Sequence, residues 1–204
     1  MPRKSEEKRR RIKEVALRVF AEKGFAKARV SEIARQAGVA DGTIYLYFKN
    51  KDDLLIRIFE EEMDGIIPQV RERVSEGKTA YEQLERFIDA HFDLVESRPD
   101  LAMVLEVELR QSNTFVRKHL KLKFKEYLDI IADIVVRGQE DGEIRGDISP
   151  SVAKQAIFGA LDDISQNWLL IQPRKVRLAD FAQDVKKILL DGLCSRPPEL
   201  ATEQ

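Results

Sequence analysis

Helical periodicity runs through nearly the whole chain and constrains its fold more than any other feature. Apolar residues recur at spacings of three and four in segment after segment, and no alternation of apolar and polar residues competes with this pattern. Residues that start and stop helices divide the pattern into about nine helices, expected at 5–23, 30–37, 42–48, 51–75, 80–96, 99–111, 114–141, 150–171 and 178–194. We therefore predict an all-α protein.

The charges of the chain are distributed unevenly. The net charge is only −1, but residues 1–51 carry 14 Lys and Arg against 6 Asp and Glu, a balance of +8, while the remainder carries 21 against 30, a balance of −9. A basic end on an acidic body indicates a nucleic-acid-binding part joined to a part with another task. We predict a DNA-binding domain at 1–52 and a second domain at 53–204.

Several kinds of site and location have no support in the residues. Cys194 is the single cysteine, which fits a reducing cytoplasm, and the chain has no signal peptide and no uncharged apolar run of about 18 residues for a membrane. His91 and His119 are the only histidines, and neither has partners at metal-ligand spacing or beside a candidate nucleophile. We expect no metal and no enzyme activity, with His91 in the core among Phe87, Ile88 and Phe92.

Residues 30–48 have the layout of a helix-turn-helix, in which two short helices pack closely and the second enters the major groove of DNA. Gly38 permits the positive φ that the tight turn needs. Small or apolar side chains are placed to pack these two helices against the helix expected at 5–23: Ile33, Ala34, Ala37, Val39, Ile44 and Phe48.

The remaining polar and aromatic residues of this stretch are candidates for DNA contact. Thr43 and Tyr45 are assigned to base edges or methyl groups, although Tyr45 has packing as an equal alternative. Gly42 would let the backbone approach DNA closely. The predicted phosphate or backbone contacts are Arg29, Ser31, Gln36, Tyr47, Lys49 and Lys51. The basic run 8–11 is either a further DNA contact or a solvated helix start.

Residues 12–59 resemble the DNA-binding domain of the TetR family of bacterial repressors. The resemblance is carried by Gly24-Phe25, Ile33-Ala34, Ala37-Gly38-Val39, Gly42-Thr43-Ile44-Tyr45, Tyr47-Phe48, Asn50-Lys51 and Leu54. One position departs from the family, because Arg29 stands where Ser or Thr usually caps the second helix. The resemblance implies a helical C-terminal domain that binds a small molecule and pairs with a second copy.

A narrower resemblance is to the fatty-acid-degradation repressors of this family, which respond to long-chain acyl-coenzyme A. It is carried by VADGTIYLYFKNKDDLL at 39–55, ELRQSN at 108–113, IFGALDD at 157–163 and Trp168. It implies an effector and no cofactor. The apolar residues that would surround an acyl tail are Leu101, Leu105, Leu109, Phe124, Leu128, Phe158, Leu161 and Trp168, and those near the headgroup are Arg110, Gln111 and Asn113. Arg110 is either a phosphate ligand or the partner of Glu106 or Glu108.

The expected assembly is a homodimer that pairs through the two C-terminal helices and reads a palindromic operator. Acyl-coenzyme A is expected to release it from DNA by favouring a different separation of the two DNA-binding domains. Two alternatives stay open at this point. One is a TetR-type repressor that answers another apolar molecule, such as a drug or a flavonoid, and the other is an acyl-thioester enzyme.

Overall fold

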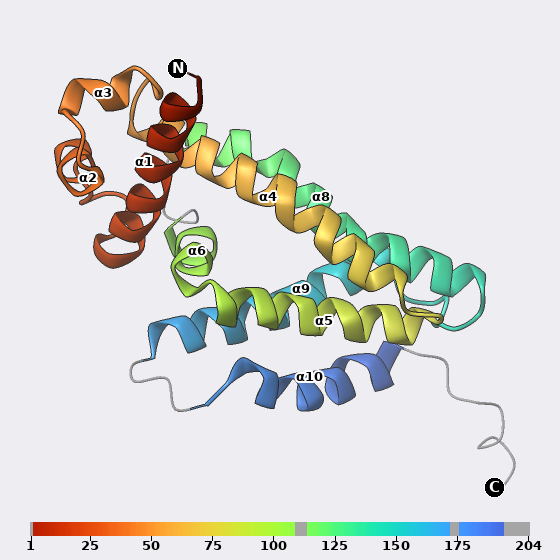
Figure 1. The fold of residues 1–204 in the computed structure, drawn as a ribbon. Helices are drawn as coiled ribbons and strands as arrows, with labels where there is room; N and C mark the ends of the chain where they lie inside the picture. The colour runs from red at the N-terminus through yellow and green to blue at the C-terminus, as the bar shows by residue number, and fades with distance from the viewer. Residues whose placement is uncertain (1, 109–113, 172–175, 194–204) are drawn as a thin grey trace, which may run out of the picture. The chain divides into compact units, whose positions relative to one another are not determined.

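The computed structural model describes residues 2–108, 114–171 and 176–193, with side chains described for all of these except 2, 3, 106–120 and 193. These residues form helices and no β-strand, so the all-α prediction is confirmed (Figure 1). The elements are α1 (Pro2–Lys23), α2 (Val30–Ala37), α3 (Asp41–Tyr45), α4 (Lys51–Ser75), α5 (Ala80–Ser97), α6 (Pro99–Ala102), the π-helical segment η1 (Met103–Glu108), α8 (Thr114–Glu140), α9 (Pro150–Leu170) and α10 (Leu178–Leu193).

Local side-chain chemistry accounts for where α4 and α5 begin. The Asn50 carboxamide oxygen accepts a 2.8 Å hydrogen bond from the Asp53 amide, which makes Asn50 the cap of α4. Before α5, the Thr79 hydroxyl accepts a 3.1 Å bond from the Glu82 amide, and the Glu82 carboxylate accepts one from the Lys78 amide. These two bonds form a capping box in which the Glu82 side chain bonds to the residue before Thr79 instead of to Thr79 itself.

Two elements differ from the predicted ones. The third helix was expected to reach Phe48, but α3 ends at Tyr45 and Leu46–Tyr47 form a turn that lets the Phe48 amide bond to the Ile44 carbonyl at 2.9 Å. The helix expected at 99–111 is an α-helical turn, α6, followed by the π-helical η1. A change to π geometry inserts one residue into a turn and shifts the faces of the residues that follow it.

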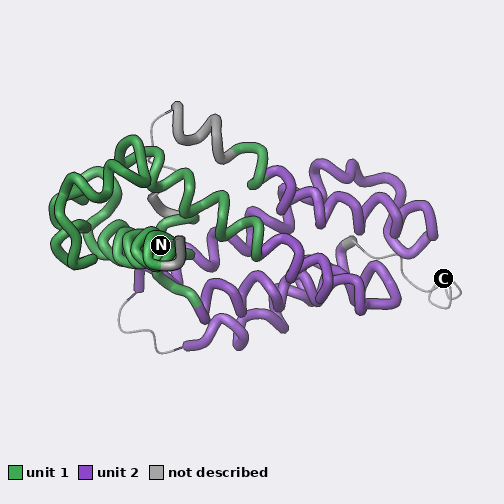
Figure 2. Tube along the Cα trace, turned by 45° about the horizontal axis from the view of Figure 1, so that its top comes forward, with its two compact units in different colours: residues 1–65, 98–124 green, residues 66–97, 125–204 purple. Residues whose placement is uncertain are grey.

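The described residues divide into two compact units (Figure 2). Unit 1 contains residues 1–65 and 98–124, and unit 2 contains residues 66–97 and 125–204, so α4 and α8 each contribute to both. The predicted domain boundary at 52/53 stays a prediction. Unit 1 closes its core around Phe20, Phe48 and Phe59, each at most 2% exposed, and unit 2 around Phe87 and Phe92.

Acidic residues of α4 bind three other segments of unit 1. Glu61 pairs with Arg9 and Lys13 of α1. The Glu62 carboxylate accepts a 2.6 Å bond from Arg98, just before α6, and Asp64 lies 2.7 Å from the ammonium of Lys123 in α8. Each pair is partly exposed and contributes little by itself. Together they fix the DNA-proximal half of α4 relative to its neighbours within the unit.

Candidate nucleic-acid interface and effector site

The turn between α2 and α3 has the geometry that the helix-turn-helix prediction requires. Gly38 adopts φ 66° and ψ 37°, the left-handed conformation that a side chain would strain. Its amide bonds to the Arg35 carbonyl at 3.2 Å, and the Val39 amide bonds to the Ala34 carbonyl at 3.0 Å, which closes the end of α2. The predicted role of Gly38 in the turn is confirmed.

The inner face of α3 is anchored and its outer face is free for contact. Ile44 is 2% exposed and Phe48 is 1% exposed, as predicted for the two core residues of this segment. Tyr45 is 56% exposed, and Leu46 is 81% exposed, more than any other large apolar side chain among the described residues. Tyr45 is therefore presented to solvent, while Leu46 was missed by the sequence analysis. Its signal was an apolar residue outside the face shared by Ile44 and Phe48.

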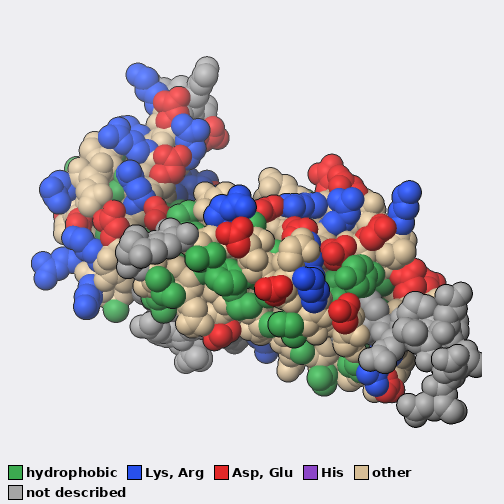
Figure 3. All heavy atoms as spheres, turned by 90° about the horizontal axis from the view of Figure 1, so that it is seen from below, with side chains coloured by type: hydrophobic (Ala, Val, Ile, Leu, Met, Phe, Trp, Pro, Cys, Tyr) green, Lys and Arg blue, Asp and Glu red, His purple; other side chains and the backbone are tan. Residues whose placement is uncertain are grey.

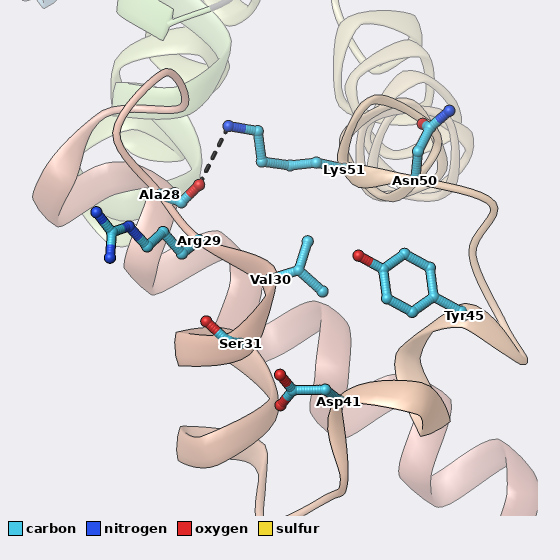
Figure 4. Close-up of a pocket in the computed structure, with 8 residues that line it drawn as sticks. All are labelled: Ala28, Arg29, Val30, Ser31, Asp41, Tyr45, Asn50 and Lys51. Atoms are coloured by element: carbon cyan, nitrogen blue, oxygen red, sulfur yellow. Dashed lines mark hydrogen bonds between the residues drawn. The ribbon is translucent and has the colours of Figure 1, made fainter.

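An open groove of about 480 Å³ lies between the start of α2, the helix α3 and the start of α4. Four residues predicted to contact DNA line it: Arg29, Ser31, Tyr45 and Lys51. Asp41 and Asn50, which were not predicted, line it as well, together with Ala28 and Val30. Figure 4 shows the Tyr45 ring directed from α3 toward Val30 across this groove, whereas the Arg29 guanidinium is directed away from it.

The other predicted DNA residues do not line this groove. Gln36, Gly42 and Lys49 are exposed, and Thr43 is half-buried in α3. The Gln36 carboxamide donates to Glu32 at 3.3 Å. Tyr47 is half-buried, and its hydroxyl accepts a 3.1 Å bond from Ser5, which ties the start of α1 to the turn after α3.

The start of α2 has no side-chain cap. Arg29 occupies the cap position with an extended backbone, φ −108° and ψ 136°, and makes no capping hydrogen bond. Ser31 does not replace it, since it lies inside the first turn. Free amides at a helix start attract anions, so the departure from the usual Ser or Thr leaves an electropositive helix end beside the Arg29 side chain.

Lys51 is engaged by the protein itself. Its ammonium donates to the carbonyl oxygens of Phe25 at 2.7 Å, Ala26 at 3.3 Å and Ala28 at 3.1 Å. It also lies 4.5 Å from the centre of the Phe25 ring. Figure 4 draws the bond to Ala28. The predicted phosphate contact of Lys51 would compete with all of these interactions.

The predicted effector residues are distributed over both units. Leu109, Arg110, Gln111 and Asn113 lie outside the described residues. In unit 1, Leu101 is buried, Leu105 is half-buried and Phe124 is 41% exposed. In unit 2, Leu161 is buried, and Leu128, Phe158 and Trp168 are half-buried. The Trp168 indole N–H donates to the Val176 carbonyl at 2.7 Å, and this bond joins α9 to the segment before α10.

Within unit 2, Phe158 packs edge-on against a buried polar cluster that the sequence analysis recognised only in part. His91 is 3% exposed, with Nδ1 3.1 Å from the Tyr127 hydroxyl and Nε2 3.3 Å from the Ser165 hydroxyl. The ring centres of His91 and Phe158 are 5.8 Å apart. Burial lowers the pKa of His91 to about 4, so the imidazole is neutral at pH 7. The prediction that His91 is a core histidine is confirmed.

No group of three or more His, Cys, Asp and Glu side chains in the described part of the chain is arranged to hold a metal ion. No helix of the described segments combines the length and the apolar character needed to cross a bilayer.

Two family descriptions together match most of the chain. Residues 12–58 match "Bacterial regulatory proteins, tetR family", and residues 59–192 match "YsiA-like protein, C-terminal region". The chain is 41% identical over 182 residues to the "Fatty acid metabolism regulator protein" of Bacillus subtilis strain 168. The aligned region covers 89% of this chain and 93% of that protein.

Solved structures give the same placement. The fatty acid degradation regulator FadR from Bacillus halodurans superposes with a TM-score of 0.85 at 38% identity, over 93% of this chain and 97% of that one. FadR from Bacillus subtilis in complex with stearoyl-CoA superposes with a TM-score of 0.84 at 41% identity, over 89% and 97%. With its helix-turn-helix geometry and these matches, the chain belongs to the tetR family of bacterial transcriptional regulators.

Proposed function

We propose that the chain is a DNA-binding repressor of fatty acid degradation genes that long-chain acyl-coenzyme A releases from its operator. The observation that carries the proposal is 41% identity, over nearly the whole chain, to a regulator whose solved structure contains stearoyl-CoA. The basic helix-turn-helix supplies the DNA-binding half of this function, and the helical body supplies the sensing half.

On the DNA side, the exposed end of α3 is proposed to enter the major groove. Thr43 and Tyr45 would contact bases, and Gly42 would let the α3 backbone approach closely. Arg29 and Ser31, at the uncapped start of α2, would contact the flanking phosphates. Gln36, Tyr47 and Lys49 complete the proposed contacts with the sugar-phosphate backbone.

On the effector side, an acyl tail needs apolar walls and the coenzyme needs cations or amides for its phosphates. Each buried methylene contributes about 0.8 kcal/mol, so a twelve-carbon tail offers roughly 9 kcal/mol before the costs of ordering. We propose that the apolar residues named above surround the tail. Arg110, Gln111 and Asn113 would bind the headgroup.

The proposed route for the signal lies inside unit 1. The elements α6 and η1 both pack against α1, and η1 and α6 hold Leu105 and Leu101 of the proposed effector site. A ligand that repositions these segments would therefore act directly on the first helix of the DNA-binding region. The ligand needs only a difference in affinity between two conformations of about 1–3 kcal/mol.

We further propose that the regulator is a cytoplasmic homodimer without enzymatic activity, paired through α9 and α10. Support comes from large apolar side chains that these helices expose, among them Val152 at 60%, Leu170 at 59% and Ile188 at 76%. Figure 3 shows hydrophobic side chains at the surface on one face of the molecule. A second copy would cover them, and two-fold symmetry fits a palindromic operator. The cytoplasmic location follows from the proposed action on the bacterial chromosome.

The proposal is tested by measuring operator binding with increasing oleoyl- or stearoyl-coenzyme A, using a duplex chosen by selection from random sequences. We expect the acyl-coenzyme A to lower the affinity for the operator at least tenfold, while coenzyme A alone and free fatty acid leave this affinity unchanged. Native mass spectrometry of the same sample should report a dimer that retains acyl-coenzyme A. If saturating acyl-coenzyme A leaves the operator affinity unchanged, the effector assignment is wrong. If only an unrelated apolar molecule releases the protein from the operator, that molecule is the effector instead.

A further inference from the structure

A side chain from another helix, Lys51 of α4, binds the loop between α1 and α2. This loop, residues 24–29, has carbonyl groups at Phe25, Ala26 and Ala28 that all accept bonds from the Lys51 ammonium, at 2.7–3.3 Å. An ammonium carries three N–H donors, so three carbonyl acceptors match its full capacity. The Phe25 ring, 4.5 Å away, adds a cation–π contact.

The two ends of this connection are both firmly placed. Lys51 is the first residue of α4, directly after the cap Asn50, so its backbone is fixed by the helix start. On the other side, the Phe25 ring packs edge-on against Phe20 of α1 with 5.2 Å between the ring centres. Lys51 therefore joins α4 to the loop and, through Phe25, to the core of unit 1.

The loop leads directly into the predicted DNA-contacting end of α2. Arg29 ends the loop and occupies the cap position of α2 without any capping bond from a side chain. Nothing in its own side chain therefore fixes the start of α2, and the loop carbonyls bound by Lys51 lie one to four residues before it. The buried face of α2 and the Lys23–Glu32 ion pair place the body of this helix, while the loop sets the path of the chain into Arg29 and the first α2 amides.

We propose that Lys51 is a positioning residue for DNA binding and not a phosphate ligand. Its ammonium holds loop 24–29 so that Arg29 and the start of α2 meet the DNA backbone. The N–H donors of this ammonium bond to carbonyl groups of the protein itself. A phosphate contact would take at least one of the three N–H donors from these acceptors, two of which belong to residues no more than 9% exposed. A part-buried carbonyl would then lose its bond to the ammonium, which costs free energy.

Salt dependence separates positioning from phosphate contact. Each neutralised phosphate contributes about −0.9 to the slope of log affinity against log salt. We expect Lys51→Met, which keeps the side-chain stem, to lower operator affinity on the order of tenfold at fixed salt, as for lost hydrogen bonds, with an unchanged slope. The matched control is Lys49→Ala two residues earlier, an exposed lysine that should reduce the magnitude of the slope by about one unit per half-site.

An arginine at the same position gives an independent test. A guanidinium is a good phosphate ligand, but its planar donors do not reproduce three bonds from one nitrogen to the loop carbonyls. We therefore expect Lys51→Arg to lose affinity as Lys51→Met does. Full affinity and an unchanged slope in Lys51→Arg, or a reduced slope in Lys51→Met, would overturn the proposal.

Hydrogen exchange tests the positioning without DNA. In the free full-length protein, amides of residues 24–33 should exchange faster in Lys51→Met and in Lys51→Arg than in the wild type, while Lys49→Ala leaves them unchanged. Exchange in α9 and α10 serves as the check that both variants are folded. If the Met variant does not fold, the Arg variant decides the question, because wild-type exchange in this segment would contradict a role in holding the loop.

Discussion

Gly42 is the residue at which the needs of the fold and of DNA binding separate most clearly. A Cβ built at this position meets no protein atom within 4 Å, so nothing in the chain itself requires glycine there. We predict that Gly42→Ala keeps or raises the melting temperature, since alanine favours helix by up to about 1 kcal/mol, but weakens operator binding. The expected loss arises because the added methyl group would lie between the α3 backbone and DNA.

The measurement combines thermal unfolding with fluorescence anisotropy on an operator duplex. Gly65→Ala in α4 is the matched control, because its Cβ is equally unobstructed and lies outside the proposed interface. It should gain stability with no change in affinity. Undiminished operator affinity in Gly42→Ala would remove the close approach of α3 to DNA from the proposed interface.

Single residues also show which parts of the candidate site sequence reasoning can reach. Gly38, Ile44 and Phe48 were predicted correctly because a positive φ and helical spacing leave direct marks on a sequence. The bonds of Lys51 could not be predicted, because its partners are backbone carbonyls, which every residue type possesses. Basic residues near a helix-turn-helix therefore invite a DNA assignment even where the protein uses their charge itself.

At the scale of elements, Gly138 fixes how closely α8 packs against the start of α5. A Cβ at Gly138 would lie 2.7 Å from the Cβ of Ala80 and 2.8 Å from the Cδ1 of Ile144. We predict that Gly138→Ala is destabilising, because overpacking costs about 1–3 kcal/mol and outweighs the helical preference of alanine. Urea unfolding followed by circular dichroism measures the change, and Gly65→Ala should shift the midpoint in the opposite direction. A more stable Gly138→Ala variant would contradict this prediction, because Ala80 and Ile144 would then make room for the added methyl group at little cost.

Helix boundaries were predicted to within a few residues where a cap or a glycine marks them, as at Asn50 and Gly24. The π-helical segment at 103–108 was not predicted. An α-turn and a π-turn differ by one residue per turn, and tertiary packing rather than residue type selects between them. The early end of α3 was missed for a similar reason: Leu46 is a good helix former and Tyr47 an average one, yet both lie in a turn that brings Phe48 into the core.

For the molecule as a whole, the buried His91 links stability to pH. Its pKa is about 4 in the folded protein and about 6.5 when exposed, so the unfolded chain binds more protons between these values. The free energy of unfolding should therefore be unaffected by this group above pH 6.5 and fall as the pH drops toward 4, by up to roughly 3 kcal/mol. Unfolding in urea between pH 4.5 and 7.5 measures this dependence.

His91→Gln isolates the contribution of this imidazole from that of other groups. Asp129, whose pKa is lowered by hydrogen bonds from Lys125 and Lys154, also loses stabilisation in acid and does so equally in both proteins. The variant should be less stable at neutral pH and show a shallower decline below pH 6.5. Parallel pH profiles for the two proteins would assign the acid sensitivity to carboxylates alone.

The sharing of α4 by both units has a practical consequence for engineering. Cutting the chain after the helix-turn-helix would remove ion pairs, because Glu61, Glu62 and Asp64 of α4 bind α1, Arg98 and Lys123. A chimera joined directly after the helix-turn-helix would lack these partners. A transplanted DNA-binding unit would also need residues 98–124, supplied in trans or by circular permutation. Changing the effector that this regulator answers is therefore better done by substituting side chains within the helices that both units share than by joining segments of two proteins.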